Sequence, residues 1–98
     1  MLYEIVLKDE ADEELAKLTS TERTLVFKQF KKIVASPELG STLGNRAGYN
    51  LSGYRKMYAD RKRIRIVYRV VEQQIVVEIV AIGKRDEMEV YKNASERV

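Results

Sequence analysis

The stretch from residue 63 to residue 82 constrains the fold most, because its pattern predicts two adjacent strands joined by a tight turn. Residues 63–71 alternate between two kinds of side chain, a period of two that is typical of a half-buried strand. One set is apolar (Ile64, Ile66, Tyr68 and Val70) and the other is mostly basic (Arg63, Arg65, Val67 and Arg69). Residues 72–74 supply the turn, and residues 75–82 are almost all apolar, as expected of a strand at the centre of a sheet.

The first third of the chain predicts a short strand followed by two helices. Residues 2–7 alternate weakly, and Asp9 is suited to cap the start of a helix. Thr19 and Glu22 have the spacing of a capping box, which opens a second helix that Ser36-Pro37 ends. The apolar faces consist of Ala11, Leu15 and Leu18 in the first helix and of Val26, Phe30, Ile33 and Val34 in the second. The short link between them predicts an antiparallel helical hairpin.

The rest of the chain completes the predicted fold. Residues 36–53 hold four of the five glycines and the only proline, so we predict a loop there with room for a turn of helix. Residues 54–58 predict a strand, and residues 86–98 a short polar helix or tail. The fold class is therefore α+β in the order β-α-α-β-β-β, with an N-terminal helical hairpin packed on a small, mainly antiparallel sheet. A chain of 98 residues is expected to form a single domain spanning 1–98.

Composition excludes several kinds of chemistry. The chain contains no cysteine and no histidine, which rules out disulfides, thiolate zinc sites and catalysis by Ser-His or Cys-His pairs. Acids at positions 10, 12, 13 and 14 favour a solvated helix start over a carboxylate metal site. The segment from Gly40 to Gly44 lacks the Gly-Lys-Ser/Thr of a phosphate-binding loop. The N-terminal MLYEIVLKDE has no long apolar run, so a cytoplasmic protein without membrane contact is expected.

Charge is unevenly distributed along the chain, although the net charge is only +3. Residues 1–24 carry seven acids (Glu4, Asp9, Glu10, Asp12, Glu13, Glu14 and Glu22) against three bases (Lys8, Lys17 and Arg23). Residues 53–70 carry seven bases (Arg55, Lys56, Arg61, Lys62, Arg63, Arg65 and Arg69) against the single acid Asp60. The basic middle implies a polyanionic partner, such as nucleic acid or an acidic protein segment.

The basic side of the alternating strand is the first candidate site. Its three arginines share one sheet face, and Arg55 from the neighbouring strand is expected to be able to join them. The planar fork of arginine clamps a phosphate with two hydrogen bonds. The alternative is a solvated strand face whose charges oppose pairing with another chain.

The stretch GKRDEMEVY, residues 83–91, is the second candidate. Leaving the sheet at Gly83, it can swing Lys84 and Arg85 over the same face and return Tyr91 to it, as a phenol for hydrogen bonding or base stacking. The alternative is an ordinary charged turn after a strand.

The helical hairpin followed by YRKMYADRKRIRIVYRVVEQQIVVEIVAIGKRDEMEVYKNA resembles the RelE toxins of the RelE/ParE superfamily, the toxin halves of type II toxin–antitoxin systems. The resemblance covers nearly the whole chain. It is most specific at residues 64–68 (IRIVY) and at GKR, residues 83–85, with EVY, residues 89–91. It implies a ribosome-dependent endoribonuclease that cuts mRNA in the ribosomal A site without a metal or cofactor, by attack of the 2′-hydroxyl on the adjacent phosphate. The implied partners are a cognate antitoxin, the ribosome and mRNA.

The resemblance also implies residue roles. Arg65 would hold the scissile phosphate, Arg85 would neutralise developing charge or assist the leaving oxygen, and Tyr91 would orient and stack on the substrate base. The family's best-known members carry two lysines separated by one residue, one of them the expected base, where this chain has residues 54–58 (YRKMY). The candidate catalytic residues are Arg55, Lys56, Arg65, Arg85 and Tyr91, and the candidate RNA-binding residues are Arg61, Lys62, Arg63 and Lys84.

The general base stays open between Lys56 and Lys84, because arginine does not deprotonate and Met57 cannot accept a proton. In a regular strand Lys56 points away from the face of Arg55, and we expect it to reach the site only through a bulge.

Two other functions remain open. A ParE-like toxin of the same fold would poison DNA gyrase by protein contact, and it has no chemical need for the Arg65, Arg85 and Tyr91 set. A non-catalytic RNA-binding relative is kept open by the missing second lysine.

Overall fold

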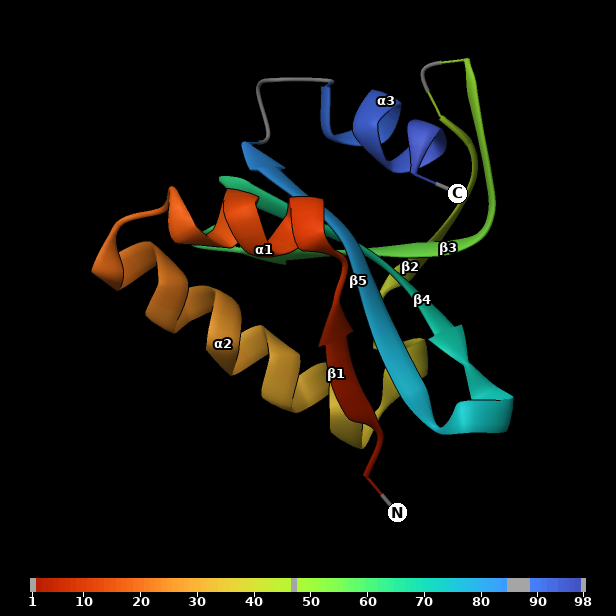
Figure 1. The fold of residues 1–98 in the computed structure, drawn as a ribbon, viewed down its shortest axis with the longest axis horizontal. Helices are drawn as coiled ribbons and strands as arrows, with labels where there is room; N and C mark the ends of the chain where they lie inside the picture. The colour runs from red at the N-terminus through yellow and green to blue at the C-terminus, as the bar shows by residue number, and fades with distance from the viewer. Residues whose placement is uncertain (1, 47, 85–88, 98) are drawn as a thin grey trace.

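The computed structural model describes residues 2–46, 48–84 and 89–97, which form a five-stranded sheet with helices on both faces (Figure 1). The elements run in the order β1 (Glu4–Leu7), α1 (Asp9–Ala16), α2 (Ser20–Ala35), β2 (Ser41–Arg46), β3 (Tyr49–Ala59), β4 (Ile64–Val71), β5 (Val76–Lys84) and α3 (Glu89–Glu96). Short 3₁₀ turns at Pro37–Leu39 and Glu72–Gln74 join α2 to β2 and β4 to β5. The strand order is β1-β5-β4-β3-β2, with β1 parallel to β5 and the other neighbours antiparallel. The predicted α+β architecture is confirmed.

The two N-terminal helices begin at local sequence signals. Thr19 accepts a hydrogen bond from the Glu22 amide (3.1 Å), and the Glu22 carboxylate accepts one from the Thr19 amide (2.9 Å), so the predicted capping box is formed. The cap of α1 is Lys8 rather than the predicted Asp9, which is the first helical residue and still places its charge at the positive end of the helix. Within the described residues, no helix is both long and apolar enough to cross a bilayer.

The glycine-rich segment 36–53 is not the loop that its composition predicts, apart from its first 3₁₀ turn. It forms β2 and the beginning of β3, which pair antiparallel with an irregularity between Thr42 and Gly44. Gly44 and Gly53 have φ values of +61° and +87°, which glycine adopts without a Cβ clash, so the hairpin can bend while it stays paired. Leu43 and Leu51 are buried beneath it and anchor it to the sheet.

The two faces of the sheet carry separate hydrophobic cores. On the face that packs against α1 and α2, hereafter the hairpin face, the core includes Ala11, Leu15, Val26, Phe30, Ile33, Ile64, Ile66, Tyr68, Val77 and Ile79. On the opposite face, hereafter the α3 face, the core consists of Leu43, Leu51, Val67, Val80, Ala81, Val90, Tyr91 and Ala94. The predicted short C-terminal helix is confirmed as α3, but it is not polar throughout. Its apolar stripe covers the sheet, and Figure 1 shows it set apart from the helical hairpin.

Candidate active site on the α3 face

The register of β3 against β4 decides which side chains share the α3 face. In antiparallel strands, directly paired residues project to the same face. Tyr58 pairs with Arg65, and Lys56 pairs with Val67, which is buried under α3. Lys56, Tyr58 and Arg65 therefore lie together on the α3 face. Lys56 reaches it from a regularly paired part of β3, without the bulge that its position in the sequence suggested.

Arg65 is held against the ring of Tyr91. Its guanidinium carbon lies 4.9 Å from the ring centre, a cation–π contact between β4 and α3. Tyr91 is only 2% exposed, and α3 is tied down at its far end by Arg97, which donates to the Val80 carbonyl (2.9 Å) and pairs with Glu14 (2.7 Å). The Tyr91 ring, to which the resemblance assigns base stacking, is therefore buried in this structure. Its contact with the guanidinium orients Arg65.

Tyr58 is the residue of this site that the sequence did not single out. Its phenol oxygen accepts a hydrogen bond from the Lys56 ammonium at 2.9 Å, and the same ammonium lies 4.8 Å from the ring centre. This hydrogen bond is the main cause that lowers the pKa of Tyr58 below its ordinary value, with help from Arg65 and with desolvation acting in the opposite direction. The available signal was the spacing, because residues two apart in a strand share a face.

Arg55 lies on the hairpin face, so the expectation that it joins the arginine face is wrong. It pairs with Tyr68, which is fully buried in the core beneath α1 and α2. Its guanidinium donates to the carbonyl oxygens of Glu38 (3.1 Å) and Gly40 (2.8 Å). The Tyr68 hydroxyl holds the same segment, donating to the Pro37 carbonyl (2.7 Å) and accepting from the Gly40 amide (2.8 Å). Arg55 therefore fixes the turn that leads into β2.

Arg69 in β4 and Arg63, just before this strand, lie apart from Lys56 and Tyr58. Arg69 shares the α3 face but forms an ion pair with Glu78 on β5 (2.7 Å). Arg63 is exposed and lines a groove described below. Of the arginines predicted to lie side by side, Arg65 is the one placed with Lys56 and Tyr58.

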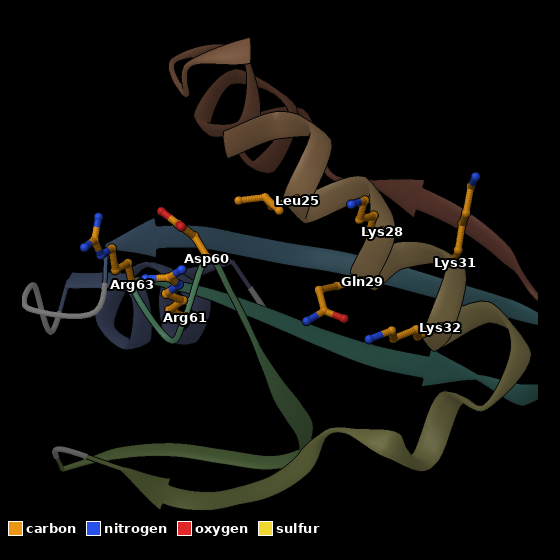
Figure 2. A pocket seen from close by; sticks show the side chains of 8 residues that line it. All are labelled: Leu25, Lys28, Gln29, Lys31, Lys32, Asp60, Arg61 and Arg63. Atoms are coloured by element: carbon orange, nitrogen blue, oxygen red, sulfur yellow. The ribbon is translucent and has the colours of Figure 1, made fainter. Parts of the chain in front are cut away.

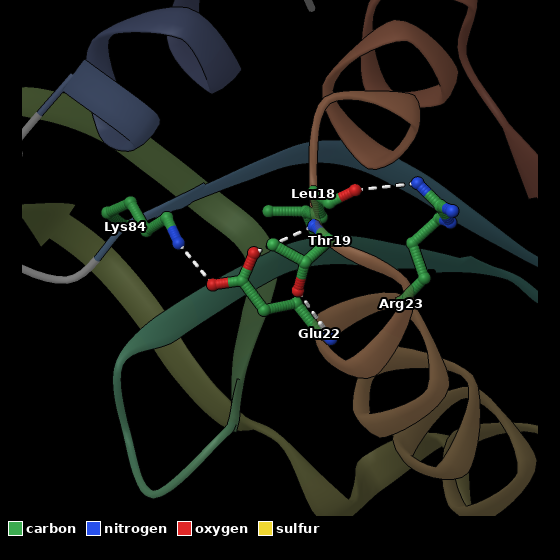
Figure 3. A network of polar contacts seen from close by, with 5 residues as sticks. All are labelled: Leu18, Thr19, Glu22, Arg23 and Lys84. Carbon is green, nitrogen blue, oxygen red and sulfur yellow. Dashed lines mark hydrogen bonds and ion pairs between the residues drawn. The ribbon is translucent and has the colours of Figure 1, made fainter.

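Lys84 ends β5 on the hairpin face, where it pairs in register with Ile64. Its ammonium bonds the carboxylate of Glu22, whose other oxygen closes the capping box of α2 (Figure 3). The bond from Lys84 is the main cause that lowers the pKa of Glu22. The expectation that Lys84 swings over the arginine face does not match this placement. Arg85 lies outside the described residues.

A basic groove of about 820 Å³ lies between α2 and the turn that joins β3 to β4. One wall comes from α2 and carries Lys28, Lys31 and Lys32, hereafter the groove lysines; the other comes from Asp60, Arg61 and Arg63 (Figure 2). Asp60, Arg61 and Lys62 have φ values of 50°, 54° and 71°, which side chains other than that of glycine rarely adopt. In this turn, hereafter the 60–63 turn, Arg61 and Arg63 line the groove, while the Lys62 ammonium lies 6.0 Å from the Tyr58 ring centre.

Comparison with known proteins places the chain among bacterial toxins. A family model described as the ParE toxin of the type II toxin–antitoxin system parDE matches residues 5–89. The chain is 30% identical to the mRNA interferase toxin RelE of Escherichia coli strain K12 over 101 aligned positions, which cover 100% of this chain and 99% of the relative.

Solved structures share the fold over the same length. A mutant of E. coli toxin RelE in the free state superposes with a TM-score of 0.81 at 28% identity, covering 100% of this chain and 99% of that one. The E. coli RelE mutant in complex with an antitoxin RelBc peptide gives a TM-score of 0.73 at 27% identity, with the same coverage. The chain therefore belongs to the RelE family of the RelE/ParE superfamily of type II toxin–antitoxin toxins.

Proposed function

We propose that this chain is the toxin of a type II toxin–antitoxin system and that it cuts mRNA in the ribosomal A site. The observation that carries the proposal is the cluster on the α3 face, where a guanidinium (Arg65), an ammonium (Lys56) and a phenol (Tyr58) converge from two paired strands. Fixed cations on a preorganised surface are suited to stabilise the charge that develops on a phosphodiester. The name of the E. coli relative, mRNA interferase, supports the same activity.

The proposed reaction is attack of a 2′-hydroxyl on the adjacent phosphate. It requires the attacking oxygen to be aligned with the phosphorus and the extra negative charge to be neutralised. Arg65, oriented by Tyr91, clamps the non-bridging phosphate oxygens with its planar fork. Lys56 adds a second fixed charge. By resemblance to the family, Arg85 acts near the leaving oxygen.

The ribosome contact that we propose uses exposed cations of the 60–63 turn and of α2. Arg61, Lys62 and Arg63 of the 60–63 turn, together with the groove lysines, present positive charge on an exposed surface. Such side chains bind the phosphate backbone of ribosomal RNA, in a contact that weakens with salt and carries little sequence information. We propose the cytoplasm as the location of the protein, because translating ribosomes are found there.

A cognate antitoxin is the second partner. The E. coli neighbour is seen with an antitoxin peptide, which supports the same kind of partner for this chain. An acidic segment that folds on binding would neutralise the basic α3 face and block substrate from Arg65.

Primer extension on mRNA bound to ribosomes with an empty A site tests the nuclease proposal. We expect a new end inside the A-site codon with the wild-type protein, and a rate about 100- to 1000-fold lower with Arg65→Ala, as for loss of one preorganised donor. Arg69→Ala is the matched control, because it removes an arginine from the same strand and face that forms an ion pair with Glu78 and lies apart from Lys56 and Tyr58. Absence of any cut by the wild-type protein contradicts the proposal.

Inhibition of DNA gyrase is the second candidate, favoured by the match to the ParE family model. A DNA supercoiling assay distinguishes the two functions. Gyrase inhibition that survives Arg65→Ala, with no cleavage on ribosomes, would establish the second candidate in place of the first.

A further inference from the structure

We propose that Tyr58 is the general base of the cleavage reaction and takes the proton of the attacking 2′-hydroxyl on its phenol oxygen. This inference rests on the proposed nuclease function and supplies the proton acceptor that the sequence left open. It assigns a role to a residue that neither composition nor spacing had singled out.

The two lysines considered as bases are not placed to accept a proton. Lys84 lies on the hairpin face, with its ammonium bonded to Glu22, and so is separated from Arg65 by the sheet. Lys56 is on the correct face but donates its hydrogen bond to the Tyr58 oxygen. A lysine in its ammonium form has no lone pair, whereas the phenol oxygen is the acceptor of this pair.

The groups around Tyr58 favour its phenolate. Three cations face it from three segments: Lys56 from β3, Arg65 from β4 and Lys62 from the 60–63 turn. The hydrogen bond from Lys56 is the main cause that lowers the pKa of Tyr58, Arg65 contributes in the same direction, and partial burial opposes both. A base must be partly deprotonated near the working pH, and these cations move the phenol in that direction.

Tyr58 is also beside the phosphate clamp, since it is the direct cross-strand partner of Arg65. The proton of the 2′-hydroxyl passes to the phenolate as the 2′-oxygen bonds to phosphorus. The bond from phosphorus to the 5′-oxygen breaks, and that oxygen takes a proton from water. The products are a 2′,3′-cyclic phosphate and a 5′-hydroxyl, and Tyr58 returns its proton to solvent.

Single-turnover cleavage of ribosome-bound mRNA, measured as a function of pH, tests the assignment. Tyr58→Phe keeps the ring but removes the acceptor, and we expect the rate to fall by about 10²- to 10⁴-fold, as for loss of a general base. Tyr54→Phe is the matched control. It removes a hydroxyl from a partly buried tyrosine on the same strand and face, four residues away, and is expected to cleave at the wild-type rate.

Two pH profiles separate a proton acceptor from a merely structural phenol. Tyr58→His should recover part of the lost activity, with an inflection near the imidazole pKa of about 6.5 in place of the inflection of the wild-type phenol. Lys56→Met should move the wild-type inflection to higher pH, because the main cation lowering the phenol's pKa is removed.

Retention of the wild-type rate by Tyr58→Phe overturns the assignment, as does a Tyr58→His profile with the wild-type inflection. Failure of the wild-type protein to cut at all would refute the nuclease function itself, so the two failures are distinguishable. Thermal unfolding of each variant, expected to match the wild type closely, confirms that the rates compare folded proteins.

Discussion

Replacing Arg55 with alanine should destabilise the protein without impairing cleavage, the opposite of the effect expected for Arg65. The Arg55 guanidinium donates two hydrogen bonds, to the carbonyls of Glu38 and Gly40, on the face away from the proposed site. Each such bond contributes about 0.5–1.5 kcal/mol net, so their loss lowers the unfolding free energy by about 1–3 kcal/mol, with the lower half expected because one bond is solvent-exposed.

For a chain of 98 residues this corresponds to a fall in Tm of roughly 5–15 °C. Circular dichroism during heating and urea titration measures the stability, and primer extension below the transition measures cleavage. Arg69→Ala is the control for loss of a surface arginine, since an exposed ion pair contributes about 0–1 kcal/mol. A 100-fold loss of cleavage by Arg55→Ala with an unchanged Tm would refute the assignment of Arg55 to the hairpin face.

Three further predictions follow from the packing and the charges. Gly40→Ala should lower the unfolding free energy by about 1–3 kcal/mol in urea titration, because an added Cβ would lie 2.5 Å from the Tyr68 hydroxyl and 2.6 Å from a backbone carbonyl; wild-type stability would contradict this close packing. The pKa of Glu22 is lowered in the folded state, so its bond to Lys84 stabilises the fold above the unfolded pKa of about 4.5 and is lost as pH falls through the lower folded value. Melting curves should therefore converge for wild type and Glu22→Gln as pH drops below 4.5 and through the folded value, and a constant difference in Tm would contradict the linkage. Neutralising one groove lysine to glutamine should reduce the slope of log affinity for ribosomes against log salt by about 0.7–0.9, whereas Lys17→Gln at the C-terminal end of α1 should not change it.

The fold was predictable because its signals are local. The alternation of residues 63–71, the capping box at Thr19 and the apolar run of residues 75–82 each fix an element without reference to the rest of the chain. β2 was not predicted, because a glycine-rich composition is found both in loops and in hairpins that bend at glycines with positive φ. The burial of α3 was missed because its apolar residues stand among charged neighbours, and only packing on the sheet shows which side they face.

The site was less predictable than the fold, because it depends on register between strands. Alternation within β3 shows that Arg55 and Lys56 point to opposite faces, but it does not show which of them shares a face with Arg65. That choice is made by the pairing of Tyr58 with Arg65. The same pairing explains why the phenol was overlooked. Spacing shows that Tyr58 shares the face of Lys56, but only the pairing with Arg65 shows that this is the α3 face.

The 60–63 turn connects these observations, because it sets both the register and the direction of the cations. If β3 slipped by one residue against β4, the two faces of β3 would be exchanged. Arg55 and Met57 would then lie on the α3 face in place of Lys56 and Tyr58. The turn that fixes the register between β3 and β4 contains three consecutive residues at positive φ. This conformation costs on the order of 1–2 kcal/mol for each non-glycine residue. Strain retained in this way is typical of functional sites. Here the same strained backbone places Lys62 beside the proposed base and brings Arg61 and Arg63 to the wall of the groove. The surface proposed to bind RNA and the proton acceptor are therefore held in one fixed relation.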